Sequence, residues 1–356
     1  MRKTQVALAA LALVASTAAM ADVTISGQID LGVFHTSKSV NGAGGTFMEQ
    51  GGLLDHSSVN ISTSEDLGGG LKAFATLETG FNANGFADNG GGAGNTTAGA
   101  GQLFNRQAFA GLSGNFGSVA FGRQLSPFIL SQALTNSGVG SFWVNRLAVG
   151  NAAGAFSSTG TGLNASGFFP ANAVTYTSPS MGGFTVRALT TTAQGTKGNV
   201  LGADAGAVDN DRFDSASIEG NVGPAFVSAA WQSNKKTYSS WTAGATMPIV
   251  DGLSVSANYM SDKPESGTEV NSYALGVKYT LMAGTDAILQ YAANDASGTS
   301  EKTLTNLTLV HAMSKRTSLY ATAASGKNVG SAIGNFANSY ADKTNTTYGV
   351  GLAHSF

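Results

Sequence analysis

The sequence predicts an all-β fold, a 16-stranded antiparallel transmembrane β-barrel with an inward-folded third loop. Three observations predict it: few charged residues with many glycines, alternation of apolar and polar residues, and recurring turn signals. Charged residues make up 11% of the chain, against roughly 25% in soluble domains. No apolar run approaches the 18 or so residues of a membrane-spanning helix. A closed barrel is the other structure that crosses a membrane with its backbone groups satisfied.

The first 21 residues are expected to be a signal peptide, so that residues 22–356 form the barrel as one domain. Arg2 and Lys3 precede a ten-residue apolar run, Val6 to Ala15, which is too short to span a bilayer as a helix. Ala19 and Ala21 occupy the small-residue positions of a cleavage site. We therefore expect export and cleavage after Ala21.

Alternation of apolar and polar residues recurs along the mature chain. Its clearest segments are residues 23–33, 184–188, 253–259, 272–281 and 348–356. Successive side chains of a strand point to opposite faces, so each segment has one apolar face for lipid and one polar face for a wet lumen. A soluble β-sandwich or a β-helix would alternate too, but a sandwich would carry more charge on its outer face. Aromatic residues near the predicted strand ends favour the membrane barrel.

Seven short turns set the strand count. They lie at residues 68–70, 114–117, 180–182, 223–224, 248–252, 282–285 and 314–316. Outer-membrane barrels have short periplasmic turns and long external loops, so seven turns and two periplasmic termini give eight hairpins and 16 strands. The third excursion is the longest, and it leaves a loop of roughly Leu125 to Pro170 once two strands are assigned. Loops of that length usually have a task, and narrowing the lumen from inside would be one.

Several stretches resemble the trimeric general porins of β-proteobacteria, the neisserial type. They include EDLGGGLKAFATLETGFN (residues 65–82), LFNRQAFAGLSGNFGSVAFGRQLSP (residues 103–127) and the terminal GVGLAHSF. The resemblance covers the whole mature chain. It implies a homotrimer in the outer membrane, surrounded by lipid, whose water-filled lumen lets ions and small hydrophilic solutes diffuse passively. It also implies that the barrel-assembly machinery reads Phe356 as an insertion signal.

The same resemblance places five pore residues. They are Lys72, Glu78, Arg106, Arg123 and Arg146. Lys72 and Glu78 share the parity of Thr76, which we expect to face the lumen. We interpret Arg106 as lumenal because it shares its parity with Ala108 and Ala110 and opposes Phe109.

Arg123 and Arg146 are the two arginines that simple alternation does not place in the lumen. Simple alternation places Arg123 on the lipid side, so a bulge at Gly122 is expected to turn it inward. Arg146 is the one cation of the third loop, and a pore role and an exposed loop position both fit it.

The basic ladder of the family is thinned in this chain. Ser58, Ser62 and Phe169 stand where relatives often carry cations, and no Asp or Glu occurs between Asp88 and Asp204. Two hypotheses follow: a weak positive potential with mild anion preference, or an apolar constriction for less polar or aromatic solutes. A plugged structural or adhesive barrel is a third alternative.

Catalysis, a cofactor, a metal and nucleic acid are not expected. The chain has no cysteine, so it offers no thiolate metal site. Its four histidines lack metal-ligand spacing, and no serine nucleophile elbow is present. After loss of Arg2 and Lys3 the basic residues number 19 − 2 = 17 against 21 acidic ones. A formal charge of −4 gives no reason to expect nucleic acid.

Overall fold

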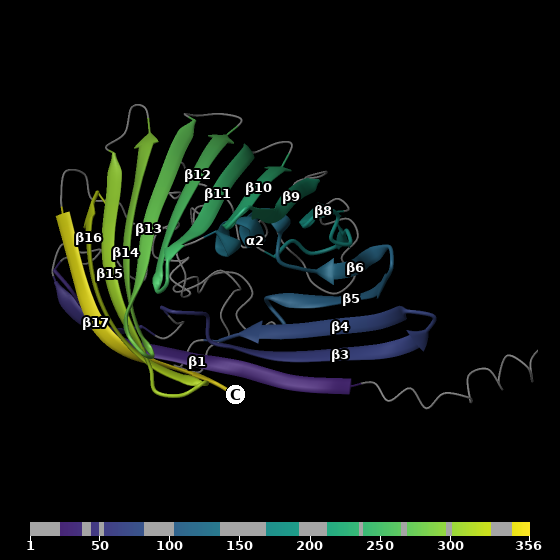
Figure 1. Ribbon diagram of the computed structural model, residues 1–356, viewed down its shortest axis with the longest axis horizontal. Helices are drawn as coiled ribbons and strands as arrows, with labels where there is room; N and C mark the ends of the chain where they lie inside the picture. The colour runs from purple at the N-terminus through teal and green to yellow at the C-terminus, as the bar shows by residue number, and fades with distance from the viewer. Residues whose placement is uncertain are drawn as a thin grey trace, which may run out of the picture.

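A computed structural model of the chain describes residues 22–37, 44–49, 53–81, 103–135, 169–191, 212–234, 238–264, 269–296, 301–328 and 344–356. These residues form one antiparallel sheet that curves round a lumen containing a short helix (Figure 1). The first half of the chain contributes β1 (Asp22–Thr36), β2 (Gly45–Glu49), β3 (Ser58–Gly68), β4 (Leu71–Gly80), β5 (Gln107–Gly114), β6 (Gly117–Arg123), helix α2 (Pro127–Leu134), β7 (Ala173–Thr177) and β8 (Phe184–Thr191). The second half contributes β9 (Phe213–Val222), β10 (Ala225–Asn234), β11 (Tyr238–Val250), β12 (Leu253–Pro264), β13 (Val270–Met282), β14 (Thr285–Ala296), β15 (Lys302–Ala312), β16 (Thr317–Lys327) and β17 (Thr344–Ser355).

The sheet is closed, because β1 is paired along both of its edges. One edge pairs with β17, from Gln28 opposite Ser355 to Thr36 opposite Thr347. The other edge pairs with β3 over its first half and with β2 over its second half. The strands β2 and β3 therefore share one position in the wall, and the 17 strands fill 17 − 1 = 16 positions. The predicted 16-stranded antiparallel barrel is confirmed.

All seven predicted short turns connect neighbouring strands. They join β3 to β4, β5 to β6, β7 to β8, β9 to β10, β11 to β12, β13 to β14 and β15 to β16. Gly223 and Gly284 show why the turns contain glycine, since their φ angles are 60° and 76°, a region that L side chains rarely adopt. The signal peptide, Ala21, Arg146 and most of the predicted third loop lie outside the described residues.

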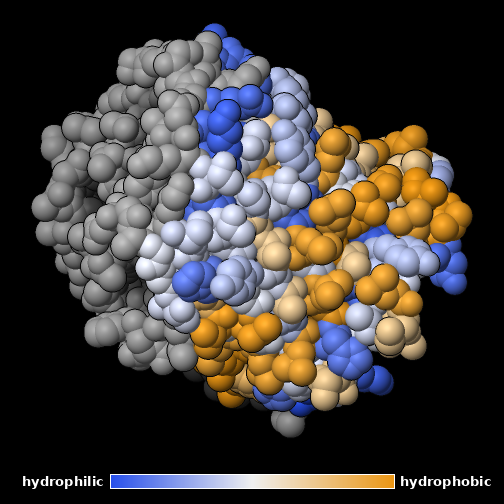
Figure 2. Space-filling model, turned by 90° about the vertical axis from the view of Figure 1, so that its left-hand side faces the viewer, coloured by the Kyte–Doolittle hydropathy of each residue, from blue (hydrophilic) through white to orange (hydrophobic). Residues whose placement is uncertain are grey.

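The outer face of the barrel is apolar. In β13 the side chains of Tyr273, Leu275 and Val277 are 42%, 53% and 39% exposed, whereas Ser272, which precedes Tyr273 and faces the lumen, is 5% exposed. Figure 2 shows apolar side chains gathered over the side of the molecule where the last strands lie. This is the alternation that the sequence predicts for a wall between lipid and water. Among the described residues, no helix is both long enough and apolar enough to cross a membrane.

The seam between β1 and β17 is fitted by aromatic rings over glycines. The rings of Phe34 and Tyr320 lie 6.5 Å apart, nearly parallel, on the lumenal side. A Cβ added to Gly349 would overlap the ring of Phe34, and one added to Gly351 would overlap the ring of Tyr320. The glycines on the inward parity of the closing strand thus leave room for rings from its two neighbours.

The last residue continues the ladder at this seam. The Phe356 N–H donates to the Gly27 carbonyl at 2.9 Å, and the Phe356 carbonyl accepts from the Gly27 N–H at 3.1 Å. A Cβ on Gly27 would lie 2.5 Å from the Phe356 ring, so the ring lies directly against this glycine. Phe356 therefore forms the last pair of the seam between β17 and β1, at the edge of the barrel.

Candidate functional site

The described start of the third loop lies inside the barrel. Ser126 caps the start of helix α2, because its hydroxyl accepts from the Ile129 N–H at 3.3 Å. Pro127 is the first residue of the helix, where its missing N–H would have no partner within the helix in any case. The buried side chains Phe128 and Ile129 cluster with Phe169, which lies at the other end of the loop. Figure 1 shows α2 within the ring of strands.

Lumenal side chains of the wall hold this helix. The Phe128 N–H donates to Ser215 Oγ of β9 at 3.1 Å. Ser228 Oγ of β10 donates to the Ser131 carbonyl at 2.9 Å. At the end of the helix, Thr135 Oγ1 donates to Asn258 Oδ1 of β12 at 2.7 Å. These contacts hold residues 126–135 against the lumenal side of the wall, and residues 136–168 of the predicted constriction loop lie outside the described residues.

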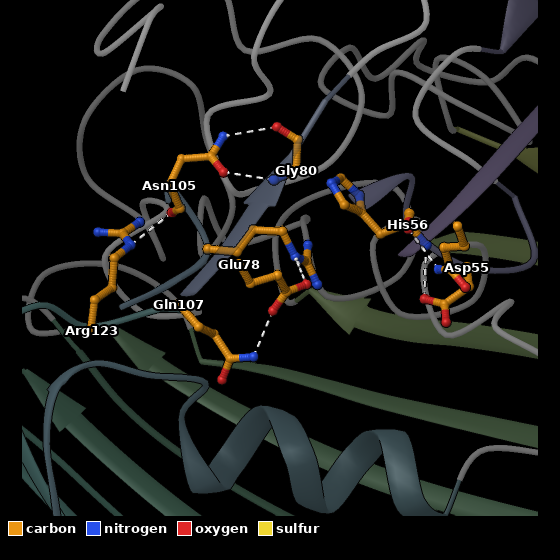
Figure 3. A network of polar contacts seen from close by, with 9 residues as sticks. Asp55, His56, Glu78, Gly80, Asn105, Gln107 and Arg123 are labelled. Atoms are coloured by element: carbon orange, nitrogen blue, oxygen red, sulfur yellow. Dashed lines mark hydrogen bonds and ion pairs between the residues drawn. The ribbon is translucent and has the colours of Figure 1, made fainter. Parts of the chain in front are cut away.

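A polar cluster lies on the wall across the lumen from α2, on β4 and at the start of β5 (Figures 1 and 3). Its centre is Glu78, which is 8% exposed. The carboxylate accepts from Arg106 Nε at 2.6 Å and from Gln107 Nε2 at 2.5 Å. The Arg106 guanidinium also lies 4.7 Å from the centre of the Phe169 ring. Arg106 is therefore neutralised by Glu78 and contacts an aromatic ring.

The structure places Arg106 at the lumen for a reason other than the one the sequence suggested. Thr76 pairs with Phe109, so Phe109 lies on the lumenal register, and Ala108 and Ala110 lie on the outer one. The prediction that Ala108 and Ala110 share a lumenal parity is therefore wrong. Arg106 reaches Glu78 because it precedes β5, where Phe104 has a φ of 58° and the chain departs from strand geometry.

Asn105 fixes this departure from the strand. Its side-chain amide accepts from the Gly80 N–H at 2.8 Å and donates to the Gly80 carbonyl at 3.2 Å. Arg123 Nε donates to the Asn105 carbonyl at 2.7 Å, as Figure 3 shows. Arg123 thus belongs to the same cluster of residues as Glu78 and Arg106.

The bulge expected at Gly122 is absent. The ladder between β5 and β6 runs without a shift from Gly114 opposite Gly117 to Ala108 opposite Arg123. Gly122 instead has a φ of 130°, which only a residue without a Cβ adopts easily. The unusual backbone conformation is confined to this glycine, with no extra residue in the strand.

Lys72 is on the lumenal register of β4, as predicted, but it does not join the cluster. It is exposed and lies beside the turn at residues 68–70. Six residues separate it from Glu78, which corresponds to about 20 Å along a strand. Lys72 therefore lies near the periplasmic mouth.

A second ion pair was missed at the sequence level. Arg187 of β8 forms an ion pair with Glu219 of β9, and Ser217 Oγ donates to Glu219 Oε2 at 3.2 Å. Alternation alone could have placed Arg187 in the lumen, because it lies between the outward-facing Val186 and Ala188. Like Arg106, this wall arginine is paired with a glutamate of an adjacent strand.

No metal site is formed by the described residues. Among them, no group of three or more His, Asp or Glu side chains comes close enough to hold an ion. Glu78 accepts from Arg106, and Ser215, Ser228 and Asn258 hydrogen-bond to residues 128, 131 and 135 of the third loop.

The comparisons with known proteins agree with this geometry. The family model described as Gram-negative porin matches residues 7–331. Outer membrane porin protein 32 of Delftia acidovorans is 29% identical over 380 residues, covering 100% of both chains. The major outer membrane protein P.IB of Neisseria meningitidis serogroup B is 42% identical over 127 residues, covering 35% of this chain and 34% of the relative.

A search of solved structures gives the same fold. The anion-selective porin from Comamonas acidovorans has a TM-score of 0.72 and 25% identity, covering 94% of this chain and 100% of that one. The trimer form of OmpT from Vibrio cholerae has a TM-score of 0.61 and 12% identity, covering 94% and 99%, and it supports the fold alone. The closed barrel, the helix inside it and the match over most of the sequence show that the chain belongs to the Gram-negative porin family.

Proposed function

We propose that the chain is an outer-membrane channel through which ions and small hydrophilic solutes diffuse passively. The observation that carries this proposal is a closed wall, apolar outside and polar inside, with α2 held in the lumen by Ser215, Ser228 and Asn258. Diffusion down a gradient needs no cofactor and no catalytic group. Family membership and the wall geometry both favour a channel over an enzyme.

Planar-bilayer recording of the purified protein tests this function. We expect discrete conductance steps that scale with bulk salt concentration, because ions cross a water-filled lumen. Heat-denatured protein in the same detergent is the control. A folded barrel that never conducts would contradict the proposal and favour the plugged structural barrel.

The ion preference we infer is mild and for anions. Arg106 and Arg187 are each paired with a glutamate, so neither gives the lumen a full positive charge. The porin of Comamonas acidovorans is named anion-selective, which supports the sign. Phe169 is 1% exposed and packs among Arg106 and the residues of α2, so it offers little surface to an aromatic solute. The burial of Phe169 therefore argues against the apolar constriction, and the sign of the mild preference is supported by the anion-selective relative.

Assembly as a homotrimer is part of the proposal. The trimer form of OmpT shares the fold, and the porin family supports the same arrangement. Crosslinking or light scattering in mild detergent is expected to give three chains per particle. A monodisperse single chain in several detergents would contradict it.

We propose that residues 1–21 are removed during export, with cleavage after Ala21, and that Phe356 is an insertion signal for the barrel-assembly machinery. The charged start and small-residue end of the leader support the first step. The paired position of Phe356 at the barrel edge is compatible with the second. A Phe356→Ala variant is expected to refold in detergent but to assemble poorly in cells. An equal loss of folded protein in detergent and in cells would indicate that Phe356 has a structural role alone.

A further inference from the structure

The wall is interrupted between β2 and β3. Glu49 at the end of β2 pairs with Gly32, and Ser58 at the start of β3 pairs with Gln28. Between these two pairs the sequence has eight residues, 50–57, whereas β1 has three, 29–31, so the segment is 8 − 3 = 5 residues longer than a continuous strand needs.

The described part of this segment, residues 53–57, turns into the lumen. Leu53 and Leu54 are 3% and 5% exposed, and they pack in one cluster with Phe34, Tyr320 and Leu304. These three neighbours are on the lumenal register of β1, β16 and β15, because the adjacent residues of the alternation face outward. The segment therefore lines the inside of the barrel on the side of β14–β16.

A buried carboxylate fastens the segment. Asp30 of β1 is 0% exposed and accepts from the Leu54 N–H at 2.6 Å, the Asp55 N–H at 3.1 Å and Tyr320 Oη at 2.7 Å. The Asp30 N–H donates to Ser57 Oγ at 3.0 Å, in place of the missing ladder bond. Hydrogen bonds to an ionised carboxylate are among the stronger ones in proteins, and here they join three separate parts of the chain.

The segment also lies against the polar cluster around Glu78. A Cβ added to Gly80 would overlap the His56 ring and would lie 2.8 Å from Arg106 Cδ, so His56 and Arg106 flank the same glycine. Figure 3 shows Asp55 and His56 beside Gly80 and Glu78. The chain thus runs from the Asp30 anchor to the cluster around Glu78 within three residues.

We propose that residues 53–57 form a second inward insertion that, together with α2, sets the open area of the pore, and that Asp30 is the positioning residue that holds it. The inference deepens the proposed function and rests on it. The lumen is narrowed from two sides: α2 against β9–β12 and the insertion against β1 and β14–β16.

The absence of cysteine from the chain allows a clean test. Leu54→Cys is placed in the unchanged chain and in an Asp30→Ala background, and each is treated with a water-soluble methanethiosulfonate. We expect slow labelling of Leu54→Cys alone. With Asp30→Ala added, labelling should be faster by about tenfold or more, because a released segment exposes its residues to water more often. Single-channel conductance of Asp30→Ala should rise by about 1.3-fold or more as the constriction widens.

The matched control is Asp286→Ala. Asp286 is a lumenal carboxylate near a periplasmic turn, held by Thr280 Oγ1 at 2.7 Å and 3.8 Å from Lys278 Nζ. It should leave conductance and the labelling of Leu54→Cys unchanged. A second variant deletes the five residues 51–55 and keeps the Asp30 side chain. It removes the extra length, together with the Leu54 and Asp55 N–H groups that donate to Asp30, and it should also conduct more than the unchanged channel.

Several results would overturn the proposal. Rapid labelling of Leu54→Cys in the intact barrel would show that the segment is not buried. Unchanged conductance in a folded Asp30→Ala barrel or in the deletion variant would show that the insertion does not limit the pore. Failure of the unchanged protein to conduct is a different outcome, since it rejects the channel function itself.

Discussion

Replacing Gly349 and Gly351 together by alanine is expected to prevent stable closure of the barrel. Each added methyl would overlap a ring, that of Phe34 or of Tyr320, and would also approach a β1 carbonyl, at 2.6 Å in the case of Leu31. Overpacking costs about 1–3 kcal/mol for each such site. The pair should therefore lower the free energy of unfolding by about 2–6 kcal/mol, measured by urea titration in detergent.

Gly45→Ala is the matched control for this prediction. Gly45 lies in β2, and a Cβ added there meets nothing within 4 Å. Its stability should stay within about 0.5 kcal/mol of the unchanged chain, as for ordinary surface substitutions. Equal stability of the Gly349/Gly351 double variant and the Gly45→Ala control would contradict the fit of rings over glycines at the seam.

Glu78→Gln is expected to make the channel clearly more anion-selective. The substitution keeps a side chain of similar size but removes the charge that neutralises Arg106, 2.6 Å away. An unpaired charge about 6 Å from a passing ion in water contributes about 0.7 kcal/mol. This favours anions about threefold and disfavours cations by a similar factor. The reversal potential in a potassium chloride gradient should move accordingly.

Arg106→Gln is the reciprocal experiment. It leaves Glu78 with Gln107 as its remaining described side-chain donor, so the reversal potential should shift toward cation preference. Both shifts should shrink at high salt, because ions screen fixed charges. Identical reversal potentials for Glu78→Gln, Arg106→Gln and the unchanged channel would show that this pair does not face the ion path.

The local parts of the fold could be predicted from sequence because their signals are local. Alternation and seven short turns, six of them containing glycine or proline, predict strand direction and number, and the structure confirms both. The predicted face is correct in β13 but wrong in β5, where Phe109 and not Ala108 lies on the lumenal register. The lumenal register of Lys72 and Glu78 followed from the same alternation. Arg187 could have been included by that reasoning, since its strand alternates clearly.

The arrangement of the lumenal side chains depends on contacts between distant residues, and so alternation could not predict it. The partners of Asp30 include Tyr320, 290 residues further along the chain. The insertion at residues 53–57 interrupts a strand without a proline or a charge run to mark it. Arg106 and Arg123 lie where strands begin and end, and there Phe104 and Gly122 take unusual φ angles that alternation does not describe.

Spin labels placed singly at residues 272–279 of β13 test the central claim most directly. In the proposed barrel, each second side chain of a strand faces lipid and the others face a water-filled lumen. Labels at the positions of Tyr273, Leu275, Val277 and Tyr279 should collide with membrane-dissolved oxygen. Labels at the positions between them should collide with a water-soluble nickel complex. Collision profiles with no period of two, or an inner face inaccessible to the nickel complex, would contradict a water-filled barrel.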